Sequence, residues 1–118
     1  GATSPSPTPV LGATATATGA SAVRITFTSK AGDTRYDVER AEGAAGTFAA
    51  TGSLAAPTTA GTVTYSDTGL KVATLYRYRI LAVSGNAVST PSAELQVTTL
   101  TFGSAAATIS TDITANRT

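Results

Sequence analysis

The chain has 118 residues, of which 13% are charged, and its eight basic and seven acidic residues leave a formal net charge of +1. This length suffices for one domain that buries a single core without metals or disulfides. The basic residues are few and dispersed, so we expect neither nucleic acid nor an anionic membrane surface as a partner.

Residue usage predicts an all-β protein. Threonine and alanine each supply about a fifth of the chain, while the charged residues that favour helices are scarce. No apolar run approaches the roughly 20 residues of a membrane span. Methionine is absent and the chain begins with Gly1-Ala2-Thr3, so we expect a removed leader or a segment of something longer. Together these features predict a processed protein of the cell surface or the extracellular space.

Residues 1–9 have three prolines at alternate positions among small polar residues. This pattern disfavours helix and sheet and favours an extended, polyproline-like backbone. It predicts an arm or linker, with a proline-rich ligand or an O-glycosylated stalk as the alternative.

Apolar residues recur at every second position in the first half of the chain, which is typical of half-buried strands. Loops are expected at 29–34 and 41–46, and a loose connection containing Pro57 at 54–61. The inward residues of the four expected strands are Leu11, Ala13 and Ala15, then Val23, Ile25 and Phe27, then Tyr36 and Val38, and finally Phe48 within 47–50.

The stretch from Tyr65 to Val83, YSDTGLKVATLYRYRILAV, is the most informative part of the chain. Val63 and Tyr65 belong to a strand, and Asp67-Thr68-Gly69 has the composition of a turn. The next strand has Tyr76, Tyr78, Ile80 and Ala82 on one face and Arg77 and Arg79 on the other. After the loop 84–87, Leu95 and Val97 predict a last strand over 94–99.

This stretch resembles a fibronectin type III domain of the form common in bacterial secreted and cell-surface proteins. In that family a leucine, a short connection and a strand-opening tyrosine follow one another as Leu70, residues 71–75 and Tyr76 do here. The resemblance implies a seven-stranded antiparallel β-sandwich of the immunoglobulin-like class over residues 10–100. It also implies a tyrosine corner, in which the Tyr76 hydroxyl bonds to backbone near Leu70. Val72-Ala73 stands where the family often has Pro-Gly, which predicts a less rigid turn. The residues expected to define the fold are Phe27, Val38, Leu70, Tyr76, Tyr78 and Ile80, with Phe27 in place of the family's buried tryptophan.

The chain contains no histidine and no cysteine, so the usual general base, thiolate nucleophile and soft-metal ligands are missing. One candidate for catalysis is a carboxylate pair, Asp37 and Glu39, which share one face of a strand as the two carboxylates of a glycosidase would. The alternative is a structural ladder of these carboxylates with Arg77 and Arg79 on the neighbouring strand, which we favour. We therefore expect no enzyme, no catalytic residues and no cofactor.

Loop motifs that bind ligands are also missing. Asp33, Asp67 and Asp112 stand alone rather than in a calcium loop, so no metal site is expected. Some members of the resembled family have an Arg-Gly-Asp tripeptide in the loop that corresponds to 84–87, which is Ser-Gly-Asn-Ala here. Residues 31–33, Ala-Gly-Asp, are expected to form a turn.

Residues 101–118 form a Thr/Ala-rich tail that the resembled domain does not need. Its alternation predicts a strand with one apolar face made of Ala105, Ala107, Ile109, Thr111, Ile113 and Ala115. Such a strand could pair with an exposed sheet edge of a neighbouring molecule. Gly103 would be the hinge of this strand. The candidate assembly residues are Phe102, Gly103, Ile109, Thr111 and Ile113.

Two functions remain open. The first is a structural subunit that assembles with copies of itself into an extracellular filament, pilus-like fibre or sheath, with other surface proteins or polysaccharide as further possible partners. The alternative is a spacer or binding module of a larger secreted enzyme or adhesin, in which residues 1–9 and 101–118 are linkers.

Overall fold

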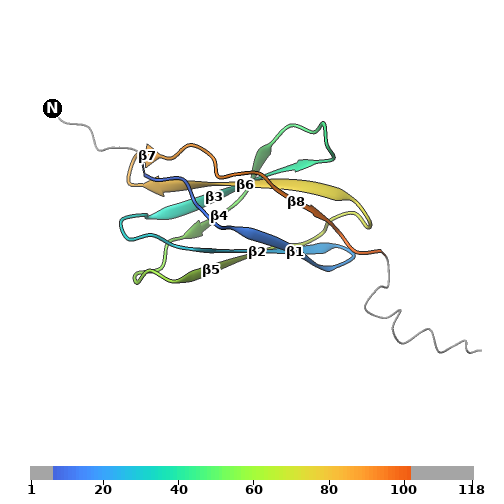
Figure 1. The fold of residues 1–118 in the computed structure, drawn as a ribbon, viewed down its shortest axis with the longest axis horizontal. Helices are drawn as coiled ribbons and strands as arrows, with labels where there is room; N and C mark the ends of the chain where they lie inside the picture. The colour runs from blue at the N-terminus through green and yellow to red at the C-terminus, as the bar shows by residue number, and fades with distance from the viewer. Residues whose placement is uncertain (1–6, 102–118) are drawn as a thin grey trace, which may run out of the picture.

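The computed structural model describes residues 7–101, which form two antiparallel sheets packed face to face (Figure 1). The first sheet has the order β1-β2-β5, and the second has β4-β3-β6, with β7 and β8 both paired to β6. The strands are β1 (Thr14–Gly19), β2 (Ala22–Thr28), β3 (Arg35–Glu42), β4 (Ala49–Ala55), β5 (Thr62–Asp67), β6 (Leu75–Ser84), β7 (Ala87–Val88) and β8 (Leu95–Thr98). The β-sandwich predicted from the sequence is confirmed. No helix able to cross a membrane occurs within residues 7–101.

The core lies between the sheets. Most of it comes from the inward residues of β2, β3 and β6, and Val10, Val63 and Leu70 complete it. Phe27 and Tyr36 meet edge to face, with ring centroids 4.8 Å apart. Each of the six residues expected to define the fold is buried: Phe27, Val38, Leu70, Tyr76, Tyr78 and Ile80. Burial of large apolar side chains in strict alternation fixes the register, because a slip by one residue would turn them all outward.

The tyrosine corner is present. The Tyr76 hydroxyl accepts a hydrogen bond of 2.9 Å from the backbone N–H of Lys71, next to Leu70. Ala73, at the position where the resembled family often has glycine, has a φ of +50°. That left-handed conformation costs a residue with a Cβ about 1 kcal/mol, so this turn is held by its surroundings.

The predicted last strand over 94–99 is present as β8, Leu95–Thr98. A two-residue strand that was not predicted, β7, pairs with β6 before it, and Pro91, which has no N–H to donate, lies between the two. Between β7 and β8, two buried serines provide hydrogen-bond acceptors for backbone N–H groups of β6. The Ser89 hydroxyl accepts from the backbone N–H of Ala82 at 2.8 Å, and the Ser92 hydroxyl accepts from that of Ile80 at 2.9 Å. The sheet edge therefore stays hydrogen-bonded without a continuous ladder.

Two sequence predictions about strands were wrong. Leu11 is 77% exposed, and Val10 is buried in its place. Gly12, with a φ of +71°, interrupts the extended backbone and ends the expected alternation. The fourth strand is Ala49–Ala55 rather than 47–50, so it includes Leu54 and excludes Phe48.

The two lateral seams of the sandwich differ. On one side β1 and β8 are in contact, and the N–H of Leu100 donates to the carbonyl of Gly19 at 3.1 Å. On the other side β4 lies opposite β5, and the side chain of Tyr65 reaches to the backbone of Gly52. A Cβ at position 52 would lie 2.4 Å from the Tyr65 hydroxyl oxygen. We call this side, formed by Gly52, Leu54 and Tyr65, the β4/β5 seam.

We predict that Gly52→Ala destabilises the domain by about 1–3 kcal/mol, because the added methyl group displaces the Tyr65 ring. Gly61→Ala is the matched control, since the nearest atom to its Cβ would be 3.9 Å away. Urea denaturation of both variants measures the effect. Equal stability of the two variants would show that Tyr65 does not pack against Gly52.

Candidate functional site

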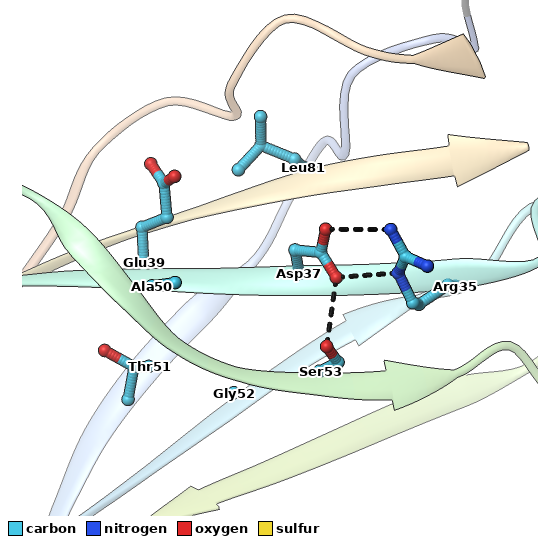
Figure 2. A pocket seen from close by; sticks show the side chains of 8 residues that line it. All are labelled: Arg35, Asp37, Glu39, Ala50, Thr51, Gly52, Ser53 and Leu81. Atoms are coloured by element: carbon cyan, nitrogen blue, oxygen red, sulfur yellow. Dashed lines mark hydrogen bonds and ion pairs between the residues drawn. The ribbon is translucent and has the colours of Figure 1, made fainter. Parts of the chain in front are cut away.

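A shallow groove of about 500 Å³ lies on the outer face of the second sheet, over β3, β4 and β6 (Figure 2). It exists because the outward residues of β4 are small, while longer charged side chains stand on β3. The lining residues are Arg35, Asp37, Glu39, Ala50, Thr51, Gly52, Ser53 and Leu81.

The charges in this groove neutralise one another. Asp37 accepts from Arg35 Nε at 2.9 Å and from the Ser53 hydroxyl at 3.1 Å, and Figure 2 shows it between these two partners. Glu39 accepts from Arg79 Nε at 2.5 Å. Exposed pairs of this kind contribute about 0–1 kcal/mol each, and they agree with a structural role for both carboxylates.

The predicted charge ladder is half correct. Glu39 lies opposite Arg79 as expected, but Asp37 lies opposite Leu81, and Arg77 lies opposite Ala41. The strand offset between β3 and β6 therefore leaves Asp37 to pair with Arg35 of its own strand.

Arg77 and Phe48 hold the loop that precedes β4. Arg77 Nε donates to the carbonyl of Gly43 at 2.8 Å, and its Nη1 donates to Glu94 at 3.1 Å. The Phe48 ring stacks on guanidinium groups, with Arg79 at 4.3 Å and Arg77 at 4.9 Å from its centroid. Phe48 was expected as a core anchor, and this was wrong: it covers arginines on the outer face, a cation–π arrangement.

A buried charged cluster lies between the sheets, and sequence reasoning missed it. Asp67 ends β5 with 5% of its surface exposed. It accepts from Arg40 Nη1 of β3 at 2.8 and 3.1 Å, and from the Tyr78 hydroxyl of β6 at 2.7 Å. Asp67 was expected in a turn because Thr68-Gly69 follows it. The signal that could have found the cluster is Arg40, which follows Tyr36 and Val38 at every second position and so falls on the inward face of β3, opposite Tyr78.

The surroundings keep both donors of this cluster protonated. Burial, and then the hydrogen bond to Asp67, raise the pKa of the Tyr78 hydroxyl above its ordinary value. Burial disfavours the charge of Arg40, but the hydrogen bond and charge of Asp67 outweigh it and raise the pKa of the guanidinium. The cluster is thus fixed as two donors around one acceptor.

A second tyrosine is fixed in a similar way at the end of the sandwich where residue 7 lies. The Tyr36 hydroxyl donates to Asp33 at 2.7 Å and accepts from the N–H of Lys30 at 2.9 Å. Burial, and then the Asp33 bond, raise the pKa of Tyr36 to about 12. Asp33 therefore closes the turn expected at 31–33.

Within residues 7–101, no three acidic side chains converge to hold a metal ion. The candidate assembly residues Phe102, Gly103, Ile109, Thr111 and Ile113 lie outside the described residues. The arrangement that the structure does describe is a surface of paired charges around a rigid core.

Comparisons with solved structures agree on the fold. An Fn3-like protein from Clostridium thermocellum superposes with a TM-score of 0.61 at 24% identity, over 73% of this chain and 85% of that one. The fibronectin type III domain of human fibronectin type III domain containing protein 3 gives 0.67 at 18% identity, over 87% and 94%. The twitchin kinase region from C. elegans (Fn31-NL-kin-CRD-Ig26) gives 0.68 at 21% identity, and there the match covers 85% of this chain but 17% of the other. No protein-family model and no curated protein matches the chain.

The sheet orders and the tyrosine corner define an immunoglobulin-like β-sandwich. Within this class of sandwich, the structural matches show that the chain has the fibronectin type III fold.

We predict that Arg40→Gln lowers the free energy of unfolding by about 2 kcal/mol. This is less than the 3–5 kcal/mol that breaking a fully buried pair costs, because 33% of the Arg40 side chain is exposed. Arg79→Gln is the matched control, with 35% exposure and the more exposed partner Glu39, and should cost below about 1 kcal/mol. Urea denaturation of both variants measures the two losses in free energy of unfolding. Equal losses would show that the pairing of Arg40 with Asp67 stabilises the fold no more than an exposed ion pair does.

Proposed function

We propose that this chain is a non-catalytic structural module of an extracellular protein, which holds the segments before and after it in line. The observation that carries this proposal is the position of the two ends of the described chain. The described chain begins at one end of the sandwich and finishes at the opposite end, and we call these ends the poles (Figure 1). A module of this geometry spaces its neighbours along one axis.

Both ends are fastened to the sandwich, which makes the spacing rigid. Near the start, Val10 is buried and Lys30 Nζ donates to the Thr8 hydroxyl at 2.7 Å. At the other pole, the Thr99 hydroxyl accepts from Thr74 N–H at 2.9 Å and donates to the carbonyl of Lys71 at 2.6 Å. These bonds define the directions in which the chain enters and leaves the sandwich.

The charge distribution supports a spacer rather than an enzyme. On the outer face of the five-stranded sheet, the arginines of β3 and β6 are bonded to carboxylates or backbone carbonyls. A surface whose charges are paired in this way has no patch of a single sign that would attract ligands of the opposite charge. The extracellular location is supported by the Thr- and Ala-rich, weakly charged composition.

A second function, self-assembly through the terminal segment, is favoured by the β4/β5 seam and by the alternating sequence of residues 105–115. It is compatible with spacing, because the seam is lateral and the poles remain free. The module would then connect segments along its own chain and associate with copies of itself alongside, as a filament or sheath subunit does.

We expect a chain truncated after Thr101 to unfold at the same urea concentration as the full chain but to lose any higher-order species. The reason is that the core cluster and the tyrosine corner of the described structure are built from residues 10–97. Light scattering and negative-stain microscopy over a concentration series measure the association. A full chain that is monomeric throughout contradicts self-assembly and leaves the spacer; polymers that persist after truncation contradict the role of the tail.

A further inference from the structure

The edge strand β4 has a composition that does not protect it from pairing. Natural edge strands are commonly blocked by lysine, proline or an inward charge. β4 reads AATGSLA and contains none of these. By contrast, the β7/β8 edge has Pro91 and Glu94 between its two strands. Within the described residues, β4 pairs with β3 and with no strand on its other side.

The β4/β5 seam beside this edge is incompletely filled. Leu54 and Tyr65 pack against the core but are only partly buried. The Tyr65 hydroxyl approaches Gly52 and has no hydrogen-bond partner among residues 7–101. An added strand next to β4 would cover both side chains and could offer backbone groups to that hydroxyl.

We propose that the β4 edge and the β4/β5 seam accept residues 105–115 of a second copy of this chain as an added strand. This inference rests on the self-assembly function proposed above and names its acceptor. The alternating segment places Ile109 and Ile113 on one face, where they would cover Leu54 and Tyr65. Its other face has Thr108, Ser110 and Asp112, which would continue the polar row of Thr51 and Ser53.

The topology favours a second copy over the chain's own tail. The chain leaves the sandwich after β8, and β8 and β4 are at opposite edges of one sheet, separated by three strand spacings or about 14 Å. It also leaves at the pole where β4 begins, since Ala49 pairs with Arg40 near the end of β3. A tail folded back on its own β4 would therefore run parallel to it, whereas a neighbour's tail can add in the more stable antiparallel direction.

The test uses the full chain with a lysine introduced at the edge. Thr51→Lys places a charge on the outward side of β4 without entering the core, and we expect it to abolish polymers seen by light scattering. Thr16→Lys, on the outward side of the edge strand β1, is the matched control and should assemble like the parent chain. Hydrogen exchange of the parent polymer should show new protection in β4 and none in β1.

The outcomes separate this inference from the function on which it rests. If Thr51→Lys assembles as well as Thr16→Lys and the β4 amides gain no protection, β4 is not the acceptor, although tail-dependent assembly stands. If the parent chain is monomeric and a synthetic peptide of residues 104–115 leaves β4 exchange unchanged, both proposals are wrong. Loss of assembly in Thr51→Lys alone, with an unchanged urea midpoint, supports the acceptor.

Discussion

The buried carboxylate of Asp67 links the two sheets through an ion pair and a hydrogen bond. It belongs to β5 in the first sheet, and its two donors, Arg40 and Tyr78, belong to β3 and β6 in the second. A carboxylate this deeply buried is tolerated only when its oxygens are fully bonded. The relative position of the sheets is thus constrained by three side chains as well as by the nondirectional burial of apolar residues.

The same cluster leads to the tyrosine corner. The Arg40 guanidinium lies 5.6 Å from the centroid of the Tyr76 ring, and the Tyr76 hydroxyl holds the backbone at Lys71. The connection from β5 to β6, which crosses between the sheets, is therefore held at Asp67 where it begins and at Tyr76 where it ends. This connection in turn binds Thr99 and Leu100, so the direction in which the chain leaves depends on it.

Much of this architecture could be predicted from the sequence because it follows from periodicity. The alternation of Tyr76, Tyr78 and Ile80 can be satisfied only by a strand with one buried face, and Leu70 before Tyr76 indicates the corner. What could not be predicted depends on partners far apart in sequence: the pairing of Asp67 with Arg40, the position of Phe48 over Arg79, and the offset that separates Asp37 from Arg77. Local breaks such as Gly12 were also missed, because one left-handed residue reverses which neighbour is buried. The candidate assembly residues were chosen from pattern alone and remain a prediction.

The two ends of the proposed rigid module point in opposite directions, and a distance measurement tests this arrangement directly. The chain has no cysteine, so spin labels can be placed at Pro7→Cys and Thr101→Cys without other changes, and the Thr8 hydroxyl that binds Lys30 is kept. Pulsed electron spin resonance should give one narrow distance distribution near the length of β6, about 30 Å for its ten residues. A short distance, or a broad distribution in a chain that remains folded, would contradict the in-line arrangement.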